Sequence, residues 1–249
     1  GPFASEKAIS AEAQAALEAK YGLDKPLGEQ YVTYLRDVVT KLDFGPSLKQ
    51  RGRQVIDIIL DGMKTSAKLG LIAAFSAAIA GIVLGALAAL RRNTVLDKII
   101  MVITTAFVSM PSFIMGSFLL IVFSVKLGWV PANGATAEGL ILPMAYVTRL
   151  ERSAMLDVLG QDYIRTARAK GVSGKKIIFG HALKNSLIPV ITYFGPMLAF
   201  IVTGSMVVEQ IFAVPGIGRQ FVSSITNRDY TMIMGTTIFL ASLIVIMNL

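Results

Sequence analysis

Four long stretches without a charged side chain dominate this sequence. They are 22, 27, 24 and 20 residues long and cover Leu69–Leu90, Ile99–Val125, Asn185–Val208 and Tyr230–Leu249. A helix needs about 20 apolar residues to cross the hydrocarbon core of a bilayer, so each stretch is long enough to span. A soluble fold of 249 residues could not bury four helices that are apolar on every side. The sequence therefore predicts an all-α, polytopic transmembrane helical bundle.

The positive charge is concentrated in two segments that follow apolar stretches. The net charge is +8, and residues 149–187 contain eight basic and three acidic residues, whereas 91–98 contain three and one. Short cytoplasmic loops are enriched in Lys and Arg. We therefore expect both segments to be cytoplasmic and residues 1–60 to be extracytoplasmic. Membrane topology accounts for the positive charge, so the charge does not indicate a nucleic-acid partner.

The chain must cross the membrane once more between the second and third apolar stretches. Only ten residues there, 139–148, are free of charge, and ten helical residues rise about 15 Å. We expect a short or incomplete crossing over 139–159 that uses Arg149–Leu159, or a sequence that lacks residues near Pro143. We also expect the natural chain to extend beyond both ends of this sequence. The expected spans are about 66–90, 99–125, 139–159, 187–208 and 230–249.

The first 60 residues are polar and have helical patterns. Ser10 is a candidate cap for a helix that ends near Lys20, and Pro26 suits the first turn of a second helix. The second helix is amphipathic, which predicts an extracytoplasmic helical segment (1–60) packed on a transmembrane domain (61–249); a membrane-surface anchor is the alternative. Its apolar face comprises Leu27, Tyr31, Tyr34, Leu35, Val38 and Leu42.

Catalytic, metal and cofactor chemistry find little support in the composition. The chain has no cysteine, a single histidine (His181) and no G-x-x-x-x-G-K-[ST] phosphate loop. We therefore expect no catalytic residue, no metal site and no bound cofactor. No ionisable side chain lies deep in the four apolar stretches, which argues against an ion-coupled carrier.

Proline and small residues mark special positions within the apolar stretches. Pro111 and Pro196 are expected to kink their helices. Gly81 and Gly85 form a G-x-x-x-G pattern, which permits close approach of two helices.

A basic insert separates two apolar stretches. Residues 162–189 read DYIRTARAKGVSGKKIIFGHALKNSLIP. We expect a helix over Leu156–Lys170, a left-handed stop at Gly171, and a second helix capped by Ser173 and running toward Pro189. Two short helices joined by a tight turn would form a knob that can dock in a protein groove; a loop that only sets topology and touches lipid head groups is the alternative. The second helix would share a face made of Ile177, Ile178, His181 and Ala182.

The insert resembles the cytoplasmic coupling loop of permease subunits in ABC-type importers, above all the B-type permease of the oligopeptide/dipeptide (peptide/nickel) branch. The matching stretch is YIRTARAKGVSGKKIIFGHALKNSLIPVIT, and VVEQIFAVPGIGRQFVSSITNRDYTMIMG, YGLDKPLGEQYVTYL and LDFGPSL are also similar to that branch. Two departures stand out: the E-A-A triplet of the superfamily falls at Arg165–Ala167, and its Leu-Pro pair falls at Leu183-Lys184. Family members also begin with an additional span and have a longer fourth span.

The resemblance implies the type I importer permease fold and a non-catalytic membrane subunit of a bacterial or archaeal inner membrane. Implied partners are a second homologous permease, two ATPase subunits that hold ATP and Mg, an extracytoplasmic solute-binding protein and a peptide. It implies a coupling loop over 160–187 that docks on an ATPase. The expected docking residues are Tyr163, Arg165, Thr166, Ala167, Ala169, Lys170 and Gly171, and the structural or gating candidates are Pro111, Pro189, Glu209, Pro215, Gly216 and Gly218.

Three alternatives remain open from the sequence. The substrate could be nickel or another small solute of an ABC importer. The chain could be an ion-coupled secondary transporter, or a membrane scaffold or receptor that transports nothing.

Overall fold

The computed structural model describes residues 24–50, 52–128 and 138–247, and in these ranges the chain is helical with no strand beyond an isolated bridge between Pro46 and Gln54. The predicted all-α class is confirmed. The helix expected between Ser10 and Lys20 lies outside the described ranges. The α-helices are α2 (Leu27–Lys41), α3 (Val55–Leu90), α4 (Val95–Ser109), α5 (Ser112–Leu119), α6 (Glu138–Leu159), α7 (Asp162–Ala169), α8 (Gly174–Lys176), α9 (Leu183–Val202), α10 (Met206–Ile211), α11 (Ile217–Asn227) and α12 (Tyr230–Met247), and two π-helices are η1 (Leu120–Lys126) and η2 (Ile177–Ala182).

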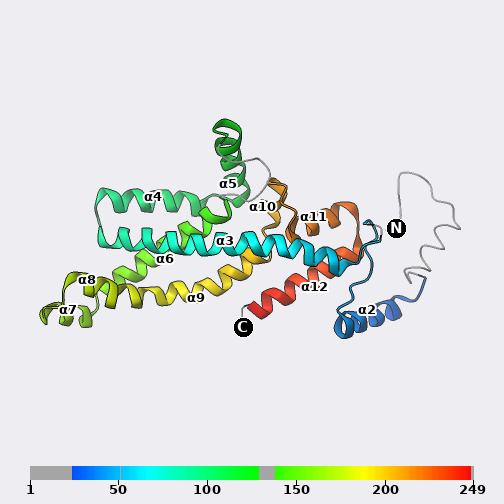
Figure 1. Cartoon of the computed structure of the whole chain (residues 1–249), viewed down its shortest axis with the longest axis horizontal. Helices are drawn as coiled ribbons and strands as arrows, with labels where there is room; N and C mark the ends of the chain where they lie inside the picture. The colour runs from blue at the N-terminus through cyan, green and yellow to red at the C-terminus, as the bar shows by residue number, and fades with distance from the viewer. Residues whose placement is uncertain (1–23, 51, 129–137, 248–249) are drawn as a thin grey trace.

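Helices α3, α6 and α9 run side by side and form the core of the bundle (Figure 1). Two glycines of α3 let α6 approach closely. A Cβ at Gly81 would lie 2.7 Å from the Cβ of Val147, and one at Gly85 would lie 2.6 Å from the carbonyl oxygen of Thr148. Side chains larger than hydrogen would push the two helices apart, so the G-x-x-x-G pattern does mark a close helix contact.

Among the described residues, three helical segments are long and apolar enough to cross a membrane: Val55–Leu90, Gly174–Ile211 and Tyr230–Met247. A fourth candidate is the pair Val95–Ser109 and Ser112–Lys126, whose axes differ by 112°. The expected kink at Pro111 is therefore a sharp break. Met110 leaves the helix with ψ of 133°, the extended conformation that a following proline favours.

One end of the molecule is built by α2, α11 and the start of α3 (Figure 1). Val38 of α2 and Phe44 are buried in a cluster with residues of α3, α11 and α12. The predicted apolar face of α2 is only partly used: Val38 is buried and Tyr34 half-buried, whereas Leu27, Tyr31, Leu35 and Leu42 are exposed. Within the described part of the chain, α2 thus packs through one narrow strip of its predicted face.

A buried aspartate ties the loop after α2 to the start of α12. Asp229 is 2% exposed, and its carboxylate accepts hydrogen bonds from the hydroxyl of Ser47 and from the backbone N–H groups of Leu48 (3.1 Å) and Met232 (3.3 Å). The bonds from Ser47 and Leu48 join segments about 180 residues apart in the sequence. The α2 segment is therefore fixed to the bundle by polar contacts as well as by Val38.

Candidate functional site

Helix α7 presents most of the expected docking residues at the surface. Tyr163, Arg165, Thr166, Ala169, Lys170 and Gly171 are exposed, and Ala167 is half-buried. On the opposite side Ile164 is fully buried and holds the helix against the rest of the chain. The helix is therefore anchored by one face and free on the other.

The end of α7 is fixed by backbone hydrogen bonds around a left-handed glycine. Gly171 has φ of +77°, its N–H donates to the carbonyl of Arg168 (3.0 Å), and the N–H of Val172 donates to the carbonyl of Ala167 (3.1 Å). This pair of bonds is the Schellman arrangement, in which glycine avoids the cost of a left-handed conformation. The predicted stop at Gly171 is therefore present, and it gives the chain a defined reversal.

The start of α7 differs from the expectation. A continuous helix over Leu156–Lys170 was wrong, because α6 ends at Leu159 and α7 begins at Asp162. The N–H of Gln161 donates to the carbonyl of Val158 (3.1 Å), so the last turn tightens before Gln161 leaves the helix with ψ of 150°. The break makes α7 a separate short helix set at an angle to the bundle.

The segment that follows the turn returns to the bundle through α8 and η2. Ser173 precedes α8, but its hydroxyl makes no capping hydrogen bond, so the predicted side-chain cap was wrong. The predicted inward face is present: Ile177 and Ala182 are buried, and Ile178 and His181 are half-buried.

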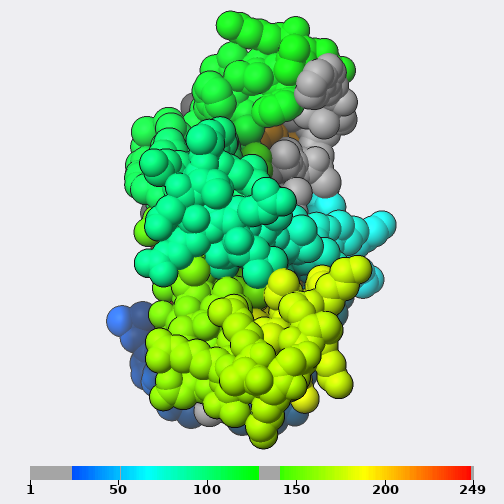
Figure 2. All heavy atoms as spheres, turned by 90° about the vertical axis from the view of Figure 1, so that its left-hand side faces the viewer, coloured from blue at the N-terminus to red at the C-terminus, as the bar shows by residue number. Residues whose placement is uncertain are grey.

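An apolar cluster connects this segment to the core helices. Ala182 packs with Ala89 of α3 and Met155 of α6. Figure 2, seen from this end, shows residues 160–182 and the start of α4 on one face of the molecule. We name residues 160–182, for which the sequence predicts a coupling role, the coupling segment, and this part of the molecule the α7 end.

At the opposite end, which we name the α11 end, three of the structural candidates converge on one carboxyl group. Glu209 is 5% exposed; its Oε1 accepts from the hydroxyl of Ser66 (2.5 Å) and its Oε2 from the N–H of Arg219 (2.9 Å). A Cβ at Gly216 would overlap this carboxyl group, and one at Gly218 would lie 3.0 Å from Oε2. The two glycines therefore leave the space that the carboxylate occupies at the start of α11.

The three proline candidates are not part of this carboxylate site. Pro215 is exposed next to Gly216, Pro111 precedes α5, and Pro189 is an exposed residue inside α9. In the described ranges no group of three His, Cys, Asp or Glu side chains could hold a metal ion.

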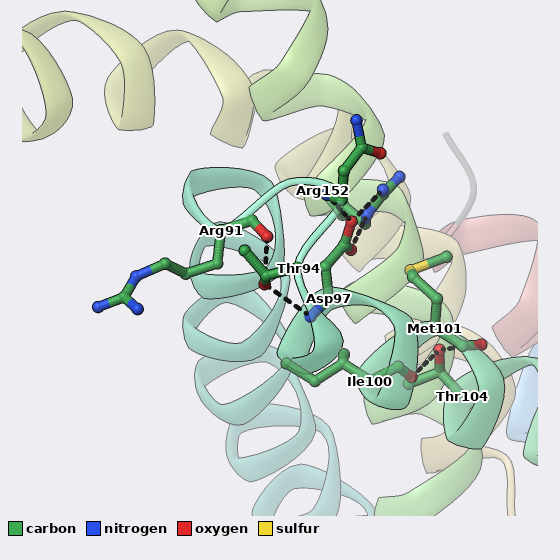
Figure 3. A network of polar contacts seen from close by, with 8 residues as sticks. Arg91, Thr94, Asp97, Ile100, Met101, Thr104 and Arg152 are labelled. Carbon is green, nitrogen blue, oxygen red and sulfur yellow. Dashed lines mark hydrogen bonds and ion pairs between the residues drawn. The ribbon is translucent and has the colours of Figure 1, made fainter.

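The sequence reasoning missed a set of polar contacts behind the coupling segment. Arg152 of α6 donates to both carboxylate oxygens of Asp97 at the start of α4, at 2.6 Å and 2.8 Å (Figure 3). The hydroxyl of Thr94 accepts from the N–H of Asp97 and caps α4. The adjacent Glu151 is fully buried, and its Oε1 accepts from the hydroxyl of Ser186 on α9 (2.7 Å).

The available signal for these contacts was the helical pattern that continues past Arg149. The expected crossing over 139–159 corresponds to α6, which packs against α3, but counting residues 149–187 as cytoplasmic gave Arg152 no expected partner inside the bundle. The partner of Arg152 is 55 residues away in the sequence, so spacing alone could not identify it.

Comparison with known proteins agrees with this geometry. The family described as "Binding-protein-dependent transport system inner membrane component" matches residues 81–249. The dipeptide transport permease DppB of Bacillus subtilis is 47% identical over 99% of this chain and 82% of its own length. The oligopeptide transport permeases OppB of Haemophilus influenzae and Escherichia coli are 43% and 41% identical, over 99% and 97% of this chain and 84% and 82% of their own lengths.

A solved structure supports the fold. The MetNI methionine ABC transporter in an inward-facing conformation matches with a TM-score of 0.67 and 18% identity, over 78% of this chain and 92% of that chain. At this identity the match concerns the fold, which is that of a type I importer permease. The chain therefore belongs to the family of binding-protein-dependent transport system inner membrane components, and relatives that cover it nearly end to end are dipeptide and oligopeptide permeases.

Proposed function

We propose that this chain is a permease subunit of an ATP-driven importer of dipeptides or oligopeptides. It forms the membrane pathway with a homologous second permease and receives peptide from an extracytoplasmic binding protein. The hydrolysis of ATP takes place on two partner ATPase subunits, which hold the nucleotide and Mg. Extensive similarity to peptide permeases supports the substrate class.

The observation that carries the coupling role is the build of α7. A lever must move as a body, because a flexible loop would absorb the displacement of its partner. Ile164 anchors α7, the Schellman turn at Gly171 fixes its end, and the side chains between them are exposed. Arg165 and Lys170 provide positive charge for acidic groups or helix C-termini of an ATPase groove.

The arrangement of the bundle also supports the expected orientation. The turn between α3 and α4, with Arg91 and Arg92, lies at the α7 end, together with the basic coupling segment (Figure 1). We place this end in the cytoplasm, and the α2 segment and α11 end outside, as the distribution of Lys and Arg favours. The docking face then points toward the compartment that contains ATP.

Cysteine cross-linking tests the docking role directly, because the chain has no cysteine of its own. The chain would be expressed with its second permease and ATPases and reconstituted in proteoliposomes. Ala169→Cys on α7 should cross-link to an ATPase subunit, with a yield that changes between the ATP-bound and nucleotide-free states. Arg53→Cys, exposed at the far end of α3, is the matched control and should give no such product.

The same vesicles test the transport activity. Addition of a peptide-loaded binding protein should stimulate ATP hydrolysis and drive uptake of labelled peptide. Purification without any ATPase, or uptake driven by an ion gradient in the absence of ATP, would contradict the proposal. Uptake of nickel but not peptide would leave the importer in place and change the substrate.

A further inference from the structure

The coupling segment leaves the bundle next to a junction of four helices. Adjacent residues of α6 reach different neighbours there: Arg152 binds Asp97 on α4, and Glu151 binds Ser186 on α9. Successive residues point about 100° apart around a helix, so the pair faces two neighbours at one level. The fourth helix, α3, closes the junction at Gly85, where a Cβ would lie 2.8 Å from the Cβ of Glu151 and 3.0 Å from the backbone nitrogen of Arg152.

The polar groups of this junction are removed from solvent. Asp97 is 2% exposed, and Glu151 and Ser186 are fully buried, while the side chain of Arg152 is 21% exposed. The guanidinium of Arg152 meets the carboxylate of Asp97 with two parallel hydrogen bonds, which fixes direction as well as distance. Such a contact resists relative rotation and sliding of α4 and α6, whereas an apolar contact at this place would permit both.

Glu151 contributes a further observation. Its second oxygen, Oε2, is buried and has no hydrogen-bond partner among the described residues. A buried polar atom without a partner is costly, and an apolar side chain of similar size would fill the same space without that cost. Packing alone therefore does not account for an acidic residue at this position.

The junction stands directly behind the lever. From Glu151 to the end of α6 at Leu159 the helix rises about 12 Å. Ser186 lies near the start of α9, directly after the return of the coupling segment through η2. The contact between Glu151 and Ser186 thus joins α6 and α9, the two helices that lead into and out of the coupling segment. The contact between Arg152 and Asp97 adds α4 to them.

We propose that Asp97, Glu151, Arg152 and Ser186 form a clamp that makes α4, α6 and α9 follow the coupling segment as one body. They are positioning residues: they touch neither peptide nor nucleotide and act through α7. The clamp rests on the proposed function, because it transmits a displacement that an ATPase imposes on α7. Its loss lets the coupling segment move while the membrane helices stay behind, so ATP is hydrolysed without transport.

The experiment measures peptide uptake and ATP hydrolysis in the same proteoliposomes, with the complete complex and loaded binding protein. Arg152→Ala and Ser186→Ala should keep stimulated hydrolysis within about twofold of the native rate while uptake per ATP falls about tenfold. The conservative Ser186→Thr retains the hydroxyl and should restore much of the ratio, as should Arg152→Lys in part. Asp61→Ala, which removes an exposed ion pair with Arg53 at the far end of α3, is the matched control and should leave both rates unchanged.

The ratio of uptake to hydrolysis separates a clamp from a structural support. A support would lower the amount of assembled complex, while the complex that remains keeps the native ratio; that result for both alanine variants would overturn the clamp. Cross-linking of Ala169→Cys to the ATPase should persist in the Arg152→Ala background, because α7 docks on the ATPase without the help of the clamp residues. If the native complex neither hydrolyses ATP nor takes up peptide, the proposed function fails. If the native complex does both and the alanine variants keep its ratio of uptake to hydrolysis, the clamp fails and the proposed function stands.

Discussion

The two ends of this molecule each bury a carboxyl group, and they hold it in different ways. At the α7 end Glu151 and its neighbour Arg152 bind side chains on two other helices. At the α11 end Glu209 binds the N–H of Arg219, ten residues along the same chain, and the hydroxyl of Ser66. The first arrangement joins α6 to α4 and to α9, whereas the second joins the long helix α3 to the short helix α10 and the start of α11. Similar chemistry therefore joins longer helices to one another at one end and holds two short helices against α3 at the other.

The largest expected effect comes from breaking the helix contact on which the α7 end depends. Gly85→Ala would place a Cβ 2.6 Å from the carbonyl oxygen of Thr148, and backbone cannot yield as a side chain does. We expect a loss of about 3 kcal/mol in stability, the upper range for an overfilled site. The thermal midpoint of the detergent-solubilised chain measures this loss.

Gly195→Ala is the matched control for Gly85→Ala. Gly195 is also a helical glycine, but a Cβ there would meet nothing within 4 Å. Its midpoint should stay or rise slightly, because alanine favours the helix. Equal midpoints for the two variants would show that α3 and α6 do not need their close approach.

The next effect concerns the α11 end. Gly216→Ala should cost about 2 kcal/mol, because the new methyl group would overlap the Glu209 carboxyl group. In the double variant with Glu209→Ala that overlap disappears, so the combined loss should be smaller than the sum of the single losses. Midpoints of the native chain, both single variants and the double variant complete the cycle. Strict additivity would mean that the glycine does not make room for the carboxylate.

A third prediction separates folding from function at the α7 end. A Cβ at Gly171 would meet no atom within 4 Å, so Gly171→Val creates no clash. It does force a β-branched residue to φ of +77°, at a cost of about 1–2 kcal/mol. The bundle should therefore fold, while the altered end of α7 lowers peptide uptake per ATP about tenfold. Gly174→Ala, with open space and no positive φ, is the control. Native uptake by Gly171→Val in proteoliposomes would count against α7 as the lever.

The smallest effect is expected for an exposed ion pair of the same length as the buried one. The ion pairs Arg53–Asp61 and Arg152–Asp97 both have a shortest N–O distance of 2.6 Å. The side chains of Arg53 and Asp61 are 42% and 62% exposed, whereas those of Arg152 and Asp97 are 21% and 3% exposed. Arg53→Ala should change stability by less than about 1 kcal/mol. Arg152→Ala should cost about 3 kcal/mol, because it leaves the carboxylate of Asp97 buried without its partner. Thermal midpoints at low and high salt test the contrast, and a similar loss in both variants would remove it.

Much of the helical framework could be predicted because it depends on local pattern. The apolar stretches, the left-handed glycine at Gly171 and the close approach at Gly85 follow from residue type and spacing. The orientation of α2 could not be read in the same way, since its apolar pattern does not show that only Val38 would find a buried place in this chain. The break between Leu159 and Asp162 depends on the path of the coupling segment and was missed.

In the candidate site, too, local features could be predicted from the sequence, whereas contacts between residues far apart in it could not. The exposed residues of α7 lie within one short segment, and the resemblance to the coupling loop of ABC importer permeases selected them; their docking role stays a prediction. The pairs Arg152–Asp97 and Glu151–Ser186 join residues 55 and 35 positions apart, so only the packing of α3, α4, α6 and α9 brings them together. Glu209 and Gly216 were selected separately, and their spatial relation required the structure.

The helical run from Gly174 to Ile211 connects the two ends of the molecule and has 38 residues. Between Ser186 and Val202 it follows α9 without a turn in the chain. One inserted residue in that stretch would rotate everything beyond it by about 100° and displace it by about 1.5 Å. Substitution on its exposed side, at Ile188, Ile191 or Phe200, leaves the rotation and position of the residues beyond unchanged. The length of α9 is therefore under tighter constraint than most of its side chains, and natural variation here should consist of replacements rather than insertions or deletions.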